Sequence, residues 1–262
     1  MSLEEWNKVC AQVSLEMIEH VKSYVTPISR VIGDNEGEHL GSGSYIELDG
    51  KRYLITNEHV AKHLKRNSLT HKFLNNENIL KLTNPFVSQS HPIDVAISKI
   101  EDSTWDALDH ESLAIPFERF SSSHNTVEHE LLFFVGYSGE RSNFYFGYMN
   151  TPGTPYLTQE LPFPNSVHQA DSNYHFALHY SPDKAISVDG TSSLPDPHGF
   201  SGSLVWDTKA VACIKENKEW SPELAEVTGI VWGWPSAAAC ILVTKVEHLN
   251  LVELKDSLPT KA

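Results

Sequence analysis

The chain is poor in cysteine and in long apolar runs. Its three cysteines, Cys10, Cys213 and Cys240, lie far apart and form no Cys-x-x-Cys pair, which argues against a disulfide framework and a cysteine-based zinc site. A reducing compartment, and hence the cytoplasm, is the simplest interpretation. No apolar run approaches the roughly 18 residues of a membrane-spanning helix. Residues 1–6 are acidic and lack a basic stretch before an apolar core, so no secretion signal is expected.

Clustered positive charge is also missing. The 262 residues include 20 Lys and Arg against 34 Asp and Glu, which gives a formal net charge of -14. Affinity for phosphate groups depends on clustered Lys and Arg, so neither nucleic acid nor an anionic membrane is an expected partner. The length and the 40% hydrophobic content are sufficient for a well-buried core.

The first 24 residues differ in pattern from the rest of the chain. Apolar residues recur at helical spacing between residues 2 and 24, which predicts an amphipathic helix. We expect this helix to pack on the outside of the main domain. The alternative is that residues 2–24 dock a regulatory partner.

From Val25 onward the apolar pattern alternates with a period of two. The pair Asp49-Gly50 separates two alternating runs and predicts a tight β-hairpin. About a dozen short strands with turn signals between them predict an all-β sandwich or barrel. Residues 151–172 read as a rim loop, and residues 244–256 as a closing helix. The expected strands lie at 25–32, 44–48, 51–56, 72–84 (one strand or two), 92–100, 131–137, 143–150, 174–180, 203–206, 209–214, 227–233 and 238–243.

Three short motifs carry candidate chemistry. Ser201 lies in the glycine-rich stretch Gly199-Phe200-Ser201-Gly202, where a hydroxyl is accessible and backbone N–H groups can face an oxyanion. His59 comes where the expected strand 51–56 stops, and Asp94 comes where the strand 92–100 begins. Each alone has a plainer explanation: a turn, a lone histidine, a strand-entry cap. His59 and His63 have a metal-binding spacing, but no third ligand is evident, so neither metal nor cofactor is expected.

Taken together, the motifs resemble those of the chymotrypsin-fold (trypsin-like) serine peptidases, in the style of the bacterial members without disulfides. The resemblance covers about residues 25–250. It implies an all-β fold of two six-stranded antiparallel barrels, at 25–120 and 131–250, with a connector at 121–130 and a tail at 251–262. An N-terminal helix (1–24) and a short C-terminal helix would lie outside the barrels. The matching segments are Gly41 to Ile46, Tyr53 to Val60, Asp94 to Ile97, Gly199 to Ser203 and Thr228 to Gly233.

The resemblance implies a serine endopeptidase acting on an intracellular protein or peptide. Ser201 would attack the scissile carbonyl, His59 would transfer the proton, and Asp94 would orient His59. The N–H groups of Gly199 and Ser201 would form the oxyanion hole. The implied substrate-binding residues are Pro195, Asp196, His198, His179, Val231, Trp232 and Gly233.

Two positions depart from trypsin itself. Phe200 precedes the nucleophile where trypsin has an acid that pairs with a new N-terminus, so activation by that ion pair is not expected. Pro195 occupies the position that sets a basic preference, with Asp196 adjacent, so a preference for Arg or Lys is not supported.

Two other functions compete with this interpretation. An α/β-hydrolase would need a second glycine where Ser203 stands, and an Asp and then a His after the serine, whereas His248 is the one histidine that follows it. A catalytically silent module of the same fold would hold a peptide strand in the cleft between the barrels. Reactivity of Ser201 separates the enzyme from the silent module.

Overall fold

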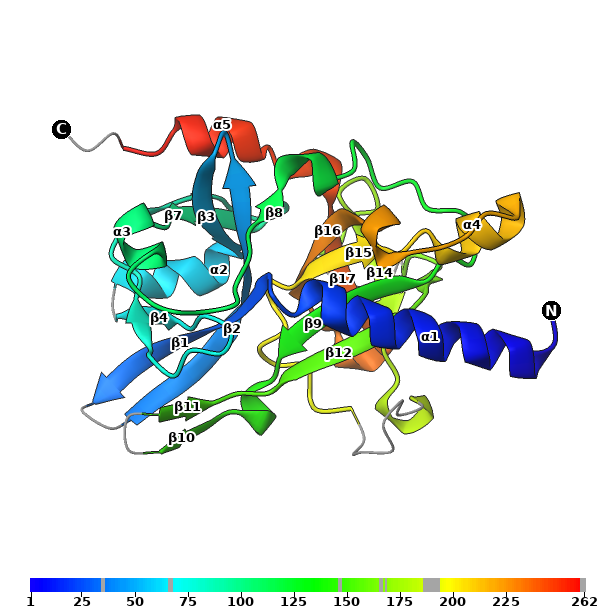
Figure 1. The fold of residues 1–262 in the computed structure, drawn as a ribbon, viewed down its shortest axis with the longest axis horizontal. Helices are drawn as coiled ribbons and strands as arrows, with labels where there is room; N and C mark the ends of the chain where they lie inside the picture. Colours follow the sequence, from blue (N-terminus) through cyan, green and yellow to red (C-terminus); the bar gives the residue numbers. More distant parts are fainter. Residues whose placement is uncertain are drawn as a thin grey trace.

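The structure is a computed structural model that describes residues 1–33, 36–65, 68–145, 148–164, 167, 169–185 and 194–259. Two curled antiparallel sheets dominate it and follow one another along the chain (Figure 1). The expected all-β architecture with two half-barrels is therefore confirmed. In the described part of the chain, no helix has the length and apolar character needed to cross a bilayer.

The first sheet has the order β5-β4-β1-β2-β3-β7-β6, with β8 added in parallel beside β2. Its hairpin β2–β3 turns at Asp49 and Gly50, which both have positive φ (50° and 69°), as the sequence predicted. The strands are β1 (Val25–Gly33), β2 (Glu36–Leu48), β3 (Lys51–Thr56), β4 (Leu69–His71), β5 (Leu80–Lys81), β6 (Phe86–Gln89), β7 (Val95–Lys99) and β8 (Ile115–Pro116).

The second sheet has the order β12-β9-β15-β16-β17-β14-β13, and all its pairs are antiparallel. A separate hairpin, β10–β11, lies beside β2. With eight and seven strands, the two sheets exceed six strands each, because short edge strands extend them. The strands are β9 (Leu132–Tyr137), β10 (Asn143–Tyr145), β11 (Tyr148–Asn150), β12 (Gly153–Thr158), β13 (Glu160–Leu161), β14 (His175–His179), β15 (Leu204–Asp207), β16 (Glu226–Gly233) and β17 (Cys240–Lys245).

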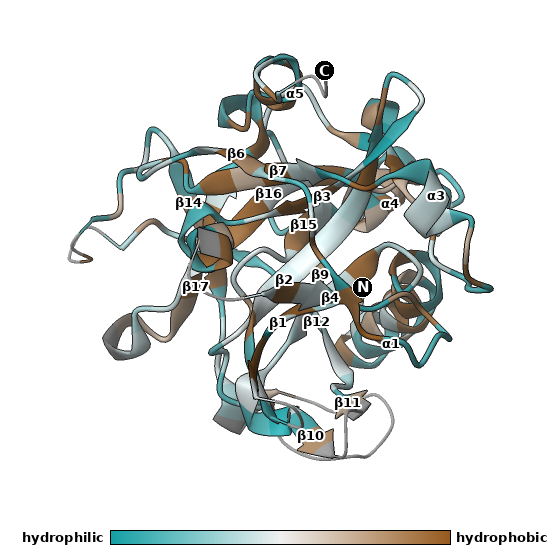
Figure 2. Cartoon of the chain, turned by 90° about the vertical axis from the view of Figure 1, so that its left-hand side faces the viewer, coloured by the Kyte–Doolittle hydropathy of each residue, from teal (hydrophilic) through white to brown (hydrophobic). Residues whose placement is uncertain are grey.

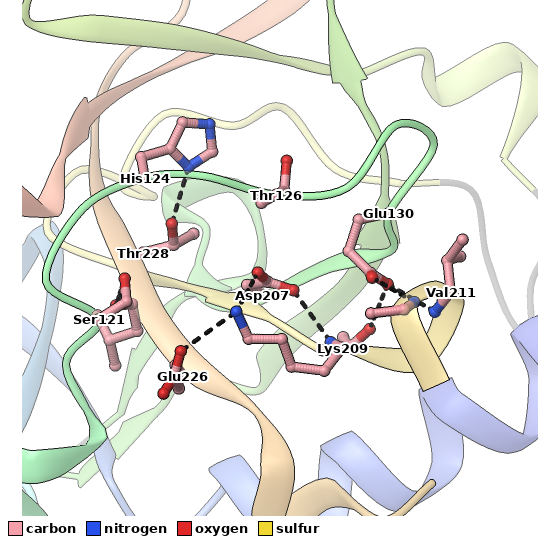
Figure 3. Close-up of polar contacts among 12 residues, drawn as sticks. Ser121, His124, Thr126, Glu130, Asp207, Lys209, Val211, Glu226 and Thr228 are labelled. Atoms are coloured by element: carbon pink, nitrogen blue, oxygen red, sulfur yellow. Dashed lines mark hydrogen bonds and ion pairs between the residues drawn. The ribbon is translucent and has the colours of Figure 1, made fainter. Parts of the chain in front are cut away.

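Two local expectations were wrong. Residues 151–172 are not one loop, because β12 and β13 lie within them as the two edge strands, where Pro155 is tolerated. Residues 209–214 are not a strand but most of helix α4 (Ala210–Glu216). The buried carboxylate of Glu130 accepts the N–H groups of Val211 and Ala212 at 2.8 and 2.9 Å and so satisfies the start of this helix (Figure 3).

Apart from the 19-residue helix α1, the other helices are short. The α-helices are α1 (Leu3–Val21), α2 (Glu58–Ala61), α3 (Asp102–Trp105) and α5 (Leu251–Asp256). The 3₁₀ helices are η1 (Lys62–Lys65), η2 (Phe117–Arg119), η3 (Gly139–Arg141), η4 (Pro182–Lys184), η5 (Pro222–Leu224), η6 (Ser236–Ala238) and η7 (Val246–His248). Helix α1 begins with a capping box between Ser2 and Glu5 and lies across β9 and β12 (Figure 1). It buries Val13, Met17 and Val21, so it packs on the outside of the second sheet as expected.

The core has three main parts. One cluster lies within the first sheet, a second lies within the second sheet, and the largest joins residues of both sheets with α1. Apolar residues accordingly follow the strands, while the loops are polar (Figure 2). The shared cluster holds the two sheets together, with Ile55 and Ile97 from the first and Phe133 and Trp206 from the second. Residues at the seam between the sheets can therefore keep a fixed geometry.

The buried His71, on strand β4 of the first sheet, makes the free energy of unfolding depend on pH. Its side chain is 2% exposed, and its Nδ1 lies 2.8 Å from the Tyr45 hydroxyl. Burial lowers the pKa of His71 to about 3, whereas an unfolded histidine has a pKa of about 6.5. Between these two pH values the unfolded chain binds a proton that the folded chain does not.

We therefore expect the free energy of unfolding to fall as the pH drops below about 6.5, by about 1.4 kcal/mol per pH unit for this one group. Urea unfolding at pH 7, 6 and 5 measures the slope. The variant His71→Phe cannot take up the proton, so its slope is expected to be smaller. Equal slopes for the two proteins would contradict the assignment.

Candidate active site

His59 and Asp94 form a close pair at the edge of the first sheet. Strand β3 ends at Thr56 and α2 begins at Glu58, which places the His59 ring just beyond the sheet. The His59 Nδ1 lies 2.6 Å from Asp94 Oδ2, and the His59 backbone N–H donates to Asp94 Oδ1 at 3.0 Å. Asp94 thus binds both the ring and the backbone of His59, which sets the tautomer with a proton on Nδ1.

The loop before β7 holds Asp94 in an uncommon conformation. Its φ is +52°, in the left-handed region that few non-glycine residues adopt. Its backbone carbonyl accepts a 2.6 Å hydrogen bond from Asn57 Nδ2, and its side chain is 8% exposed. By contrast, the His59 side chain is 38% exposed. The imidazole therefore faces solvent, and the carboxylate lies behind it.

The turn that carries Ser201 depends on two glycines. Gly199 and Gly202 have φ values of +104° and +94°. A Cβ at Gly199 would come within 2.6 Å of the Tyr137 carbonyl, and one at Gly202 within 2.0 Å of the Ser42 carbonyl. Both positions therefore require glycine, for conformation and for space.

Ser42 joins this turn to the first sheet. Its N–H donates to the Ser201 carbonyl at 2.7 Å, and its hydroxyl donates to the Gly199 carbonyl at 2.8 Å. The same hydroxyl accepts the Tyr137 N–H at 2.9 Å. A Cβ at Gly41 would touch both Val60, which follows His59, and the Ser201 carbonyl, at 2.8 and 3.1 Å. The Ser201 turn and the segment after His59 thus both pack against Gly41 of β2.

The Ser201 hydroxyl donates a long hydrogen bond, 3.4 Å, to the Trp232 carbonyl. Among the described residues, no hydrogen bond joins Ser201 Oγ to the His59 ring. Rotation about the Cα–Cβ bond of Ser201 is the motion that changes the partner of this hydroxyl. In enzymes without bound substrate, the hydrogen bond between a catalytic hydroxyl and its base is often long or poorly aligned.

Two backbone N–H groups beside Ser201 are unpaired within the described part of the chain: those of Gly199 and Ser201. The N–H groups of the intervening Phe200 and of the next two residues, Gly202 and Ser203, are all bonded to backbone carbonyls at 2.9 to 3.0 Å. The turn therefore leaves free the two donors that an oxyanion would need.

Phe200, which precedes Ser201, anchors the turn in the core cluster of the second sheet. It is 1% exposed, and its ring lies 5.6 Å from that of Phe134 and 5.9 Å from that of Tyr180. The turn is thus held in place by packing of the second sheet.

His39 lies behind the same turn, and no sequence pattern predicts it there. Its Nε2 is 2.8 Å from the Tyr137 carbonyl, and a Cβ at Gly199 would approach it to 2.6 Å. Burial lowers the pKa of His39. Neither its position in β2 nor its neighbours signal this contact in the sequence, because Gly199 is distant along the chain.

The residues expected to bind substrate fall into three groups. Pro195, Asp196 and His198 lead into the Ser201 turn, where Asp196 accepts the His198 N–H at 2.9 Å and also contacts its ring. Trp232 and Gly233 end β16 beside Ser201, whereas Val231 is buried and pairs with Gly202 and Ser203 through its backbone.

His179, the last of the expected substrate-binding residues, ends β14 and pairs with Cys240. Its neighbour Tyr180 donates a 2.5 Å hydrogen bond to the Pro195 carbonyl and contacts Phe200. The end of β14 therefore lies next to the segment that leads into the Ser201 turn.

Two small concavities, of about 170 and 150 Å³, lie away from this site, and neither is lined by His59, Asp94 or Ser201. The hydrogen bonds around Ser201 and Trp232 locate the candidate site better than these two concavities, because candidate catalytic groups lie together there. Within the described ranges, no group of three or more His, Cys, Asp or Glu side chains is arranged to hold a metal ion.

Comparison with known proteins gives matches among solved structures. No model of a protein family matches the chain, and no curated sequence does. One solved structure is a catalytically active tobacco etch virus protease complexed with product, with 12% identity, a TM-score of 0.47, and coverage of 90% of this chain and 80% of the other.

A second matching structure comes from work on the intrinsically disordered VPg protein of Sesbania mosaic virus, whose coupled folding and binding is driven by aromatic interactions. It has 12% identity, a TM-score of 0.42, and coverage of 87% of this chain and 97% of the other. Neither similarity identifies a nucleophile or a substrate for this chain. The two successive curled antiparallel sheets themselves have the arrangement of a chymotrypsin-like fold.

Proposed function

We propose that the chain is a serine endopeptidase that uses His59, Asp94 and Ser201 as a triad. The observation that carries the proposal is the His59–Asp94 pair at 2.6 Å. The segment after His59 packs against Gly41 of β2, and so does the turn that carries Ser201 between two glycines. In the described part of the chain this turn has two unpaired N–H donors. A base oriented by a carboxylate, a hydroxyl nucleophile and an oxyanion site are the parts that acyl transfer requires.

In this mechanism the Ser201 hydroxyl turns from the Trp232 carbonyl toward His59. The neutral His59 ring keeps its proton on Nδ1, against Asp94, and accepts the serine proton at Nε2. Oγ bonds to the scissile carbonyl carbon, and the N–H groups of Gly199 and Ser201 stabilise the oxyanion. His59 then protonates the leaving amine. Water, deprotonated by the same ring, releases the acyl group from Ser201.

The end of β16 offers a binding edge for an extended peptide. Val231 is paired with Gly202 and Ser203 through its N–H and carbonyl, and strand β15 begins only at Leu204. Beyond Val231, therefore, the strand edge at Trp232 and Gly233 extends past the nucleophile turn. A peptide added along this edge would bring its scissile bond to Ser201 by main-chain hydrogen bonds.

The residues near the end of β16 argue against a basic preference. Asp196 Oδ1 accepts the His198 N–H and also contacts the His198 ring, so its carboxylate is already engaged. The rings of His198 and Trp234 meet edge-on at 5.5 Å. We propose a protein or peptide substrate in an extended conformation, and not a nucleic acid.

A catalytically silent peptide-binding module is the second candidate. The observation in its favour is that the Ser201 hydroxyl is bonded to Trp232 and not to His59. In that case the same β16 edge would hold a peptide, and the serine would remain unreactive. Reactivity of the Ser201 hydroxyl toward an electrophile distinguishes the two functions.

Further parts of the proposal concern the setting of the enzyme. The free cysteines Cys10, Cys213 and Cys240 support a cytoplasmic peptidase in the style of the bacterial, disulfide-free members of this fold. The exposed side of α1, which includes Leu3 and Leu15, is where a regulatory partner of residues 2–24 would bind.

Cleavage-site profiling tests the endopeptidase directly. A denatured proteome is incubated with the wild-type chain or with Ser201→Ala, and new N-termini are identified by mass spectrometry. We expect a defined set of internal cleavages that the variant does not produce. Cleavages that persist in both Ser201→Ala and His59→Ala would contradict the proposal.

A further inference from the structure

The loop that carries Asp94 belongs to the first sheet but is held by the second. The Pro92 carbonyl lies 2.7 Å from Nε2 of His175, on β14. The Ile93 carbonyl accepts a 3.0 Å hydrogen bond from Oγ1 of Thr244, on β17. The two residues that immediately precede Asp94 are therefore each fixed by a side chain of the second sheet.

The hydrogen bonds of His175 determine its tautomer. Its Nδ1 accepts the Asp171 N–H at 3.0 Å, so the ring proton is on Nε2, which donates to Pro92. The side chains of His175 and Thr244 are 1% and 0% exposed. Neither can touch a substrate, and both ring nitrogens of His175 are already occupied.

The surroundings of His175 favour its neutral form. Burial lowers its pKa, and the nearby His91 and His248 act in the same direction, while the hydrogen bond to the Pro92 carbonyl and the charge of Asp171 oppose them. The ring also contacts Trp232 at 4.9 Å and stacks with His91 at 6.0 Å. A protonated ring would place two N–H groups, its own and that of Asp171, against each other. The neutral form is therefore the one that fits this loop.

We propose that His175 and Thr244 are positioning residues that hold Asp94, across the seam between the two sheets, in the orientation that binds His59. Asp94 has a φ of +52°, a conformation that persists only where the surroundings hold it. Asn57 supports Asp94 from the first half of the chain, and the His175 and Thr244 side chains support it from the second sheet, by donating to the two carbonyls before it. The inference rests on the proposed function for its effect on rate, but not for its effect on structure.

Two substitutions at one position separate the hydrogen bond from general packing. In His175→Gln the amide nitrogen can occupy the place of Nε2 and still donate to Pro92. In His175→Asn the amide oxygen can replace Nδ1 and accept the Asp171 N–H, but the shorter side chain has no donor that reaches the Pro92 carbonyl. We expect His175→Asn to lower kcat by about 10- to 100-fold with little change in KM, and His175→Gln to stay close to wild type.

Amide hydrogen exchange tests the same coupling without any need for activity. The His59 N–H is protected by Asp94 Oδ1, so its exchange rate reports the position of that carboxylate. We expect faster exchange at His59 in His175→Asn and Thr244→Val, and unchanged exchange in His175→Gln and at amides of β9. Equal exchange rates at His59 in the Asn and Gln variants would overturn the inference. An inactive wild type would contradict the proposed peptidase function. The exchange rates would still decide whether His175 and Thr244 position Asp94.

Discussion

Asp94→Asn is expected to lower kcat by about 10⁴-fold while the fold is retained. The amide oxygen of asparagine can still accept the His59 backbone N–H, which Asp94 Oδ1 accepts in the wild type. The amide NH₂ would then face His59 Nδ1, where Asp94 Oδ2 now lies at 2.6 Å. Because an amide only donates there, the ring would carry its proton on Nε2 and could not accept one from Ser201.

Turnover of a peptide substrate and thermal unfolding, measured on the same samples, check this prediction. Asp102→Asn is a matched control, since Asp102 is a largely exposed carboxylate that pairs with Arg52. We expect the control to keep wild-type turnover. A loss of less than tenfold in Asp94→Asn would show that the carboxylate does not set the tautomer of a catalytic base.

Ser201→Ala is expected to lower turnover by at least about 10⁴-fold, with no loss of stability. The hydroxyl makes one long hydrogen bond, to the Trp232 carbonyl, so its removal costs the fold little. Ser203→Ala supplies the control, because Ser203 lies two residues on, is fully buried and cannot meet a substrate. Turnover should survive in the control. Similar losses in both variants would point to damage of the turn rather than to a missing nucleophile.

The parts of the site that the sequence predicted are those that depend on local pattern. The alternation through Lys51–Thr56 places His59 at a strand end, and Asp94 precedes a run of buried apolar residues in β7. The glycines at 199 and 202 mark a turn that no other residue can make. Each of these signals lies within a few residues of the feature it predicts, so the three motifs and the all-β class could be predicted from the sequence.

The parts that were missed depend on contacts between distant segments. Helix α4 forms where a strand was expected because Glu130, remote in the sequence, satisfies its first N–H groups. The bonds from Ser42 to the Ser201 turn and from His175 to the Asp94 loop likewise join the two sheets. The direction of the Ser201 hydroxyl depends on Trp232 in β16. No local pattern carries such information.

The most direct test is whether Ser201 is a nucleophile. Incubation of the folded wild-type chain with a fluorophosphonate, followed by peptide mass spectrometry, locates any adduct. Activation by His59 and two unpaired N–H donors predicts one adduct per chain, on Ser201, that is absent from Ser201→Ala and strongly slowed in His59→Ala. An unlabelled wild type, or an adduct on a residue other than Ser201, would contradict the triad.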